Sequence, residues 1–185
     1  MDINELLKGF DCECGKKHTC DIKYVYIERN ATHRLSEICN EFHSILLVAD
    51  ENTFGAAGEK TVCALGDKVT RKVVFSGASI LVPNEDAIHR VSSNLESIDL
   101  IVGIGSGVIQ DLCKYVSFES SIPYVIVATA PSMDGYASNG AAMITGGMKV
   151  TYPATLPLAI VADTEALAAA PIEMLKAGYG DIIGK

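Results

Sequence analysis

The segment from Asp99 to Ser138 constrains the fold more than any other part of the chain, because it contains two apolar strands that each end in a loop of small residues. Leu100–Val102 is followed by the glycine-rich turn 103–107, and Tyr124–Val127 is followed by the loop 128–135. An amphipathic run comes directly after the glycine-rich turn. Glycines at a strand-to-helix turn let the backbone approach a ligand closely, and the helix start offers free N–H groups to an anion. A phosphorylated cofactor is therefore expected at this point.

Strands and helices alternate through the middle of the chain. Successive strands begin about 25 to 30 residues apart with helices between them, which is the spacing of repeated βαβ crossovers. Strands that are apolar throughout belong in a parallel sheet covered on both faces. We therefore predict an α/β fold with a Rossmann-like parallel sheet and flanking helices. The predicted strands are 45–49, 73–75, 100–102, 124–127 and 158–161, with an edge strand at 21–28, and the predicted helices are 31–42, 53–65, 84–95 and 111–118.

The pattern changes in the last quarter of the chain. A β-hairpin is predicted at 141–152, where two apolar runs flank a Gly-Gly pair. Asp163 or Thr164 is expected to cap a short alanine-rich helix. Pro171 suits the first turn of a further helix, and Gly178 suits its end.

Composition and charge exclude several classes of protein. Apolar residues make up 49% of the chain and charged residues 21%, which is typical of a globular protein. The formal net charge of −8 leaves no basic stripe for a nucleic acid. The chain opens without the basic segment and apolar core of a signal peptide, and no apolar run approaches the length that spans a bilayer. A cytoplasmic protein without a nucleic-acid partner is expected.

Candidate metal ligands gather near the N-terminus. Cys12, Cys14, His18 and Cys20 form the sequence Cys-x-Cys-Gly-x-x-His-x-Cys, whereas the other cysteines lie within apolar helical patterns. The cluster offers ligands for zinc, but the Cys-x-Cys spacing is tight and the usual two-residue spacers are absent. An exposed, thiol-rich turn is the favoured interpretation.

The glycine-rich turn is a weak signal by itself. Its pattern is Gly-x-Gly-x-Gly, which differs from the Gly-x-Gly-x-x-Gly fingerprint of dinucleotide-binding sites. It also follows the fourth predicted strand rather than the first. Phosphate binding and a tight structural turn are both open at this stage. Asp111 either anchors the turn or is a solvated helix residue.

Three further features each allow a structural and a functional interpretation. Asp50 follows a strand end, where a carboxylate either caps a helix, which position alone favours, or binds a ribose diol and disfavours a 2′-phosphate. The loop 132–135 has turn chemistry, yet it follows a strand at the edge where open α/β sheets bind ligands. Asp181 is by itself a helix N-cap, since one aspartate does not define a metal site.

Taken in order along the chain, these features resemble one family. The sn-glycerol-1-phosphate dehydrogenases, within the superfamily of iron-containing alcohol dehydrogenases and dehydroquinate synthases, share this order over nearly the whole chain. The Ser-Met-Asp-Gly and Gly-Tyr-Gly-Asp blocks are specific, whereas the glycine turn is generic. The matching features are Asp50, Gly-x-Gly-Ser-Gly with Asp111-x-x-Lys114, the loop from Thr129 to Ser138, Ala162-Asp-Thr-Glu165, and Gly-Tyr-Gly-Asp181-x-x-Gly-Lys185.

The resemblance implies three parts: a Cys-rich turn and edge strand at 1–28, a Rossmann-like nucleotide-binding domain at 29–170, and the start of a helical metal-binding domain at 171–185. It implies NAD or NADP and a divalent metal ion (zinc, nickel or iron) as cofactors. The substrate would be a small phosphorylated molecule. Asp134 would bind the substrate, and Asp181 would be a metal ligand that also touches the substrate, so both are candidate catalytic residues.

The implied cofactor site follows the carboxyl edge of the sheet. The turn and the helix start would cradle the pyrophosphate, Asp50 would hold the adenosine ribose, and the second loop would lie along the cofactor. The candidate cofactor-binding residues are Asp50, Gly105, Ser106, Gly107, Val108, Ile109, Gln110, Asp111, Thr129, Ala130, Pro131, Ser132 and Ser138.

The implied reaction is reversible hydride transfer between NAD(P)H and dihydroxyacetone phosphate, giving sn-glycerol 1-phosphate. The resemblance implies a metal site completed by two histidines from a C-terminal helical domain, and we expect the sequence up to Lys185 to lack that domain. We therefore expect negligible activity of the 185-residue chain alone. We also expect an exposed apolar face on the sheet near 158–183 and self-association into a homo-oligomer. A dehydroquinate synthase-like lyase and a non-catalytic nucleotide-binding module are the alternatives.

Overall fold

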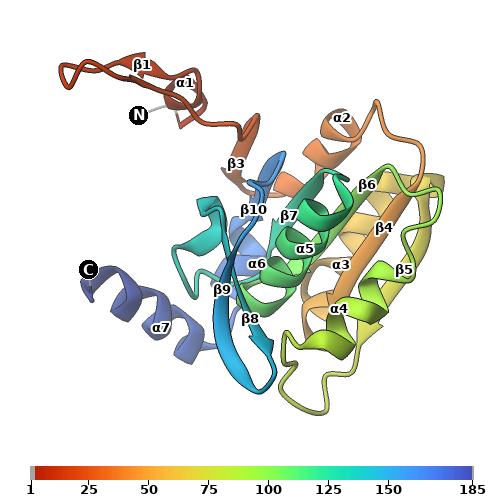
Figure 1. Cartoon of the computed structure of the whole chain (residues 1–185). Helices are drawn as coiled ribbons and strands as arrows, with labels where there is room; N and C mark the ends of the chain where they lie inside the picture. The colour runs from red at the N-terminus through yellow and green to blue at the C-terminus, as the bar shows by residue number, and fades with distance from the viewer. Residues whose placement is uncertain (1–2, 185) are drawn as a thin grey trace.

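A parallel sheet of six strands forms the centre of the computed structural model, which describes residues 3–184 (Figure 1). From one edge to the other the strands follow the order β3-β10-β7-β6-β4-β5, and every neighbouring pair is parallel. The predicted α/β class is confirmed, and so is the edge position of the strand predicted at 21–28. The strands are β3 (Tyr24–Glu28), β4 (Ile45–Asp50), β5 (Val69–Phe75), β6 (Leu100–Gly105), β7 (Tyr124–Ala128) and β10 (Ala159–Asp163).

Helices cover both faces of this sheet, because alternate side chains of the central strands point to opposite faces. The helices are η1 (Ala31–Arg34), α2 (Leu35–Ile38), α3 (Glu51–Leu65), α4 (Glu85–Ser92) and α5 (Gly107–Ser120), and the predicted hairpin is β8 (Gly140–Thr145) with β9 (Met148–Pro153). In β4, Leu46 and Val48 pack with α4, α5 and the hairpin, whereas Leu47 and Ala49 pack with α2 and α3. Figure 1 shows α4 and α5 in front of the sheet and α3 behind it.

The order of the strands reverses between β4 and β6. After β4 the chain adds β5 on one side, and it then adds β6, β7 and β10 in turn on the other side. Open α/β sheets bind ligands outside the carboxyl ends of the strands at such a switch point. The carboxyl ends that flank the switch point are Asp50 and Gly105.

Two segments project from this body (Figure 1). One is a hairpin of β1 (Phe10–Asp11) and β2 (Lys17–His18), which follows α1 (Ile3–Leu7). The other is α7 (Ile172–Ile183), which follows the short α6 (Thr164–Ala168) and its N-cap Asp163. Short 3-10 turns, η2 (Gly66–Lys68) and η3 (Gly135–Ala137), complete the described elements. None of the described helices is long and apolar enough to cross a membrane.

Several predicted boundaries are wrong. The helix predicted at 31–42 is a 3-10 turn followed by α2, which ends at Ile38. The Lys68 ammonium donates to the carbonyls of Cys39 and Asn40 just beyond this end, at 2.9 Å each. The helix predicted at 84–95 ends at Ser92, the one predicted at 111–118 begins at Gly107, and the strand predicted at 73–75 begins at Val69.

The C-terminal expectations also need correction. Gly178 does not end a helix but lies buried inside α7, and Asp181 lies in the last turn of α7 rather than at a helix start. Within 158–183 the exposed large apolar side chains are on α7 and not on β10, where Ile160 is only 7% exposed, whereas the neighbouring edge strand β3 exposes Tyr24 and Ile27. The exposed set on α7 comprises Ile172, Met174, Tyr179, Ile182 and Ile183. The division at 28 and 170 remains a prediction, and Met1, Asp2 and Lys185 lie outside the described residues.

Candidate functional site

The two predicted turns lie side by side at the carboxyl edge of the sheet. The register pairs Ala49 with Ile104 and Gly105 with Ala128, so the segments after β4, β6 and β7 leave the sheet at the same level. The backbone N–H of Thr129 donates to the carbonyl of Gly105 at 3.2 Å, which joins the two turns directly. The switch point of the sheet and the loops singled out in the sequence are therefore one place.

Glycines in the first turn have two different physical roles. A Cβ at Gly105 would lie 2.7 Å from the Cβ of Ile109, and one at Gly103 would lie 2.7 Å from the Sγ of Cys113. Glycine is required at both positions because α5 crosses β6 at close range and leaves no room for a side chain. A Cβ at Gly107 would meet nothing within 4 Å. Gly107 thus leaves open space above the start of α5.

The start of α5 carries backbone donors without a side-chain cap. Ser106 is the N-cap residue, and its side chain makes no capping hydrogen bond. Its carbonyl accepts the first helical bond, from the N–H of Gln110 at 2.9 Å. The N–H groups of a helix's first turn have no partner within the helix and attract anions. Ser106, Val108 and Ile109 at this helix start line a cavity.

A continuous groove runs along this edge. A cavity of about 240 Å³ lies between the ends of β4 and β6, and a second of about 500 Å³ lies on the β7 side. Asn52, Thr53, Ser106 and Met174 line both, so the two cavities meet at the start of α5. The first is also lined by Asp50, Ser76, Gly77, Ser79, Ile80, Leu81, Val108 and Ile109, and the second by Ala56, Thr129, Ala130, Ala166, Ala169, Ala170 and Pro171.

Asp50 both caps α3 and lines this groove. Its Oδ1 accepts the N–H of Thr53 at 2.8 Å, and the Thr53 hydroxyl accepts the N–H of Asp50 at 3.1 Å, which is a complete capping box. The capping interpretation from the sequence is therefore confirmed. The position in the first cavity is compatible with a ribose contact as well.

A buried lysine holds the second loop against α5. Lys114 is 1% exposed, and its ammonium donates to the Gly140 carbonyl at 2.9 Å, the Gly135 carbonyl at 3.3 Å and the Ser138 hydroxyl at 3.0 Å. Burial lowers the pKa of Lys114, and the carboxylate of Asp111 at 3.6 Å opposes that shift. Lys114 was part of the sequence match but not of the predicted site. Its apolar helical surroundings were the available signal.

Further hydrogen bonds fix the same loop. The buried Gln110 amide donates to the carbonyl of Tyr136 at 2.9 Å, and the Tyr136 hydroxyl donates to the carbonyl of Ala130 at 2.8 Å. Burial raises the pKa of Tyr136, so its hydroxyl stays a donor near neutral pH. Burial raises the pKa of Tyr124, and the neighbouring Gln110 side chain opposes that shift, although the Oε1 of Gln110 and the Tyr124 hydroxyl have no hydrogen-bond partner among the described residues.

Asp111 takes neither of its two expected roles. It is half-buried, and its carboxylate accepts the backbone N–H of Ala142 in the hairpin as well as pairing with Lys114. Burial raises its pKa. Asp111 therefore joins α5 to the hairpin and does not anchor the glycine turn.

The two candidate catalytic aspartates meet at the end of the loop. The Oδ2 of Asp181 accepts the backbone N–H of Asp134 at 2.9 Å, and both residues are exposed. Gly178 makes this contact possible, because a Cβ there would lie 1.9 Å from the carbonyl oxygen of Pro131. The helix therefore touches the loop backbone at Gly178, and Asp181 follows within one turn.

The structure thus gathers most of the predicted site but not all of it. Asp50, Ser106, Val108, Ile109, Thr129 and Ala130 line the groove, with Gly105 and Gly107 in the turn itself, whereas Pro131 lies outside the groove lining and against Gly178. The side chains of Gln110, Asp111 and Ser138 instead bind the loop and the hairpin, and Ser132 lies beside Gly178. Groove residues that the sequence did not single out are Asn52, Thr53, Ser76, Gly77 and Met174.

Metal-ligating side chains are sparse near Asp181. Among residues 3–184, the cluster of three or more potential ligands is Cys12, Cys14 and His18, far along the chain from Asp181. Asp181 offers a carboxylate, and Asp134 contacts it through the backbone. A hard divalent cation prefers several oxygen ligands, and among the described residues the Asp181 carboxylate stands without a cluster of such ligands.

A parallel sheet with a groove at its switch point defines the class: a Rossmann-like α/β domain. Residues 26–171 match the family model described as iron-containing alcohol dehydrogenase, and the chain belongs to that family.

The chain is also similar to individual named proteins. The chain is 33% identical to "Glycerol-1-phosphate dehydrogenase [NAD(P)+]" from Halalkalibacterium halodurans, covering 99% of this chain and 49% of that protein. An archaeal relative with the same name, from Methanosarcina mazei, is 32% identical over 86% of this chain and 45% of its own length. The chain spans about half the length of these curated relatives.

Solved structures support the fold. Glycerol dehydrogenase from Schizosaccharomyces pombe is similar with a TM-score of 0.70 at 23% identity, covering 88% of this chain and 42% of that one. The iron-containing alcohol dehydrogenase from Thermococcus thioreducens gives a TM-score of 0.75 at 13% identity, covering 88% of this chain and 50% of that one.

Proposed function

We propose that the chain is the dinucleotide-binding part of an NAD(P)- and metal-dependent dehydrogenase that interconverts dihydroxyacetone phosphate and sn-glycerol 1-phosphate. The observation that carries this proposal is the groove at the switch point, which opens on the uncapped start of α5. The names of the relatives support the substrate and the cofactor.

The residues present fit a dinucleotide. Open space at Gly107 lets a diphosphate approach the N–H groups of the first turn of α5. The adenosine end would lie toward Asp50, and the nicotinamide end toward Thr129 and Ala130 in the second cavity. When bound, the dinucleotide supplies or accepts the hydride, and the chain orients it.

Asp134 and Asp181 fit the substrate end of the groove. The two residues meet where the loop contacts α7, and the side chains of both are exposed to an incoming molecule. The Asp181 carboxylate would hold the divalent metal ion together with ligands from outside the described residues, and that ion would stabilise charge on the carbonyl oxygen. The hydrogen bond from the Asp134 N–H orients Asp181 for this role.

Titration of NADH, followed by its fluorescence, tests the cofactor site. Gly107→Val fills the space above the helix start and is expected to weaken binding at least tenfold, which is about 1.4 kcal/mol. Gly55→Val is the matched control, because Gly55 is also a helical glycine with nothing within 4 Å of an added Cβ. Equal affinities of the two variants would contradict the proposed position of the diphosphate.

Amide chemical shifts test the substrate site. In the NADH-bound protein with added Zn²⁺, dihydroxyacetone phosphate is expected to shift the amides of Asp134 and Asp181. Dihydroxyacetone without the phosphate should have a weaker effect, and Asp181→Asn should lose the response while keeping NADH affinity within about twofold, or 0.4 kcal/mol. Shifts confined to residues distant from this loop would refute the substrate assignment.

A further inference from the structure

The N-terminal hairpin holds a cluster that the proposed dehydrogenase site does not use. β1 and β2 pair Phe10 with His18 and Asp11 with Lys17, and the turn between them is closed by the N–H of Cys12 donating to the carbonyl of Lys16 at 3.0 Å. This turn carries two cysteines, and His18 stands on the returning strand. The ligand atoms of Cys12, Cys14 and His18 all lie within 4.8 Å of one another.

The backbone prepares these side chains to act as ligands. The backbone N–H of Cys14 donates to the Sγ of Cys12 at 3.5 Å, which holds this sulfur on the inner side of the turn. The Sγ of Cys14 lies 3.3 Å from the Nε2 of His18. Gly15, at φ 79°, takes the left-handed conformation that turns the chain back after Cys14.

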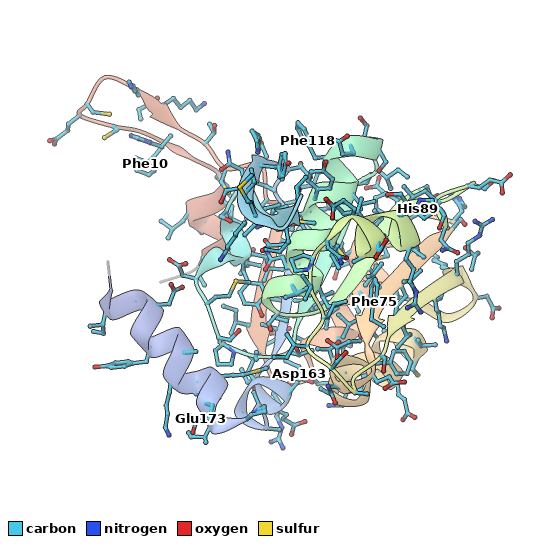
Figure 2. The ribbon with its side chains drawn as sticks, turned by 60° about the horizontal axis from the view of Figure 1, so that its bottom comes forward. Phe10, Phe75, His89, Phe118, Asp163 and Glu173 are labelled. Carbon is cyan, nitrogen blue, oxygen red and sulfur yellow. The ribbon has the colours of Figure 1, made fainter. Side chains whose placement is uncertain are left out.

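The His18 ring is oriented by its neighbour across the hairpin. The rings of Phe10 and His18 pack with their centroids 5.3 Å apart. Phe10 itself is 57% exposed and stands away from the main body, where Figure 2 labels it. This packing restricts rotation of the His18 ring, whose Nε2 lies 3.3 Å from the Sγ of Cys14.

We propose that Cys12, Cys14 and His18 bind a zinc ion that stabilises the β1–β2 hairpin. Zinc takes thiolate sulfur at about 2.3 Å and imidazole nitrogen at about 2.0 Å, which requires ligand atoms about 3.5 to 3.8 Å apart. Small rotations of three exposed side chains achieve that spacing from the observed one. Two thiolates also neutralise the charge of the ion.

The fourth coordination position belongs to solvent. Cys20, the remaining thiol of the segment, is not in the cluster; it is half-buried and packs against the main hydrophobic core. The proposed zinc ion therefore has three protein ligands, and its fourth coordination position is open to water.

The hairpin needs such a ligand for its stability. Each strand has two residues, and every residue of the strands is exposed. A two-stranded hairpin of this kind is marginally stable in water by itself. Because zinc binds the folded turn and not the open chain, its binding free energy becomes folding free energy of the hairpin. The Cys-x-Cys spacing, which seemed too tight from the sequence, is accommodated because the turn places both sulfur atoms beside His18.

Metal substitution of the whole 185-residue chain tests the proposal. The reduced, metal-free protein is titrated with Co²⁺, and a sulfur-to-cobalt charge-transfer band is expected and is displaced by Zn²⁺. This band reports thiolate ligands, so it is independent of any metal ion at Asp181. Cys14→Ser and His18→Ala should weaken Zn²⁺ binding at least tenfold, whereas Cys63→Ser, which removes an exposed thiol on α3, should leave it unchanged.

Hydrogen exchange of the hairpin provides the second readout. Zn²⁺ is expected to slow exchange of the Cys12 and Gly15 amides by at least fivefold in the natural chain and not in Cys14→Ser. The proposal is overturned if the band is absent, if Cys14→Ser keeps it, or if Zn²⁺ leaves this exchange unchanged. Loss of binding in Cys20→Ser would overturn the open fourth position.

Discussion

Replacing Gly178 with alanine should separate α7 from the loop that carries Asp134. The added Cβ would lie 1.9 Å from the carbonyl oxygen of Pro131 and 2.9 Å from its carbonyl carbon. Both atoms belong to the backbone, so no side-chain rotation removes the clash. An ordinary carbon–oxygen contact is about 3.3 Å, and α7 must therefore move away by more than about 1 Å.

Two opposing effects decide the size of this change. Alanine in place of glycine favours a helix by about 0.5 to 1 kcal/mol. An overpacked contact that must be relieved by a backbone shift costs about 1 to 3 kcal/mol. The clash is the larger effect, so the docked position of α7 should lose about 1 to 2 kcal/mol. Such a loss lowers the docked-to-undocked ratio by a factor of about 5 to 30.

Amide hydrogen exchange of Asp134 measures this ratio directly. Its N–H donates to the Oδ2 of Asp181 at 2.9 Å only while α7 is docked. In Gly178→Ala this amide should exchange about 5 to 30 times faster, and the melting temperature of the sheet should change little.

Gly180→Ala is the matched control for this experiment. Gly180 lies in the same helix, and an added Cβ there meets nothing within 4 Å. In Gly180→Ala the Asp134 amide should exchange as slowly as in the natural chain or more slowly, because only the helix propensity changes. Equal exchange at Asp134 in Gly178→Ala and in the natural chain would refute the claim that this glycine positions the two aspartates.

Three further predictions concern the groove and the core. Asp50→Ala should lower the free energy of unfolding by about 1 kcal/mol in urea denaturation, and Asp50→Asn should keep that cap while raising NADPH affinity relative to NADH; equal stability of all three proteins would contradict the capping role. Gly105→Ala should destabilise by about 1 to 3 kcal/mol and Gly107→Ala by less than about 0.5 kcal/mol, and the reverse order would contradict the two glycine roles. Burial raises the pKa of the Cys39 thiol from 9.0 to about 12. The protonated thiol therefore stabilises the folded chain fully below pH 9, and this contribution is lost as the pH rises to about 12. The free energy of unfolding should fall by up to about 1.4 kcal/mol per pH unit across this range, and Cys39→Ala should make that fall less steep.

Local patterns were sufficient to predict the strands and the edge at which the site forms. Continuous apolar runs before Asp50, Gly103 and Ala128 indicated strands buried on both faces, and their carboxyl ends do lie together. The N-caps Asp50 and Asp163 followed from residue type and position. Such signals depend on a few neighbouring residues, which is why one sequence contains them.

Contacts between distant residues were not predictable in the same way. Lys114 binds carbonyls 21 and 26 residues further along the chain, and nothing in its own helix shows that these acceptors exist. Gly178 looked like a helix terminator, because glycine commonly ends helices and the close carbonyl of Pro131 is visible only in three dimensions. In both cases a general preference of the residue type was overridden by tertiary packing.

The stability of the site is unevenly distributed, and this has a consequence for function. The part of the groove proposed for the diphosphate is formed by the ends of β4 and β6 and the start of α5, with Met174 of α7 at its border, and the strand residues are almost all fully buried. Asp181 depends on α7, in which Gly178 is the buried residue and the apolar side chains are mostly exposed. Segments with few buried contacts open first, at a free energy below that of global unfolding. Opening of α7 would remove Asp181 from Asp134 and leave the helix start at Gly107 intact, so dinucleotide binding should persist under mild denaturant after the substrate end has come apart.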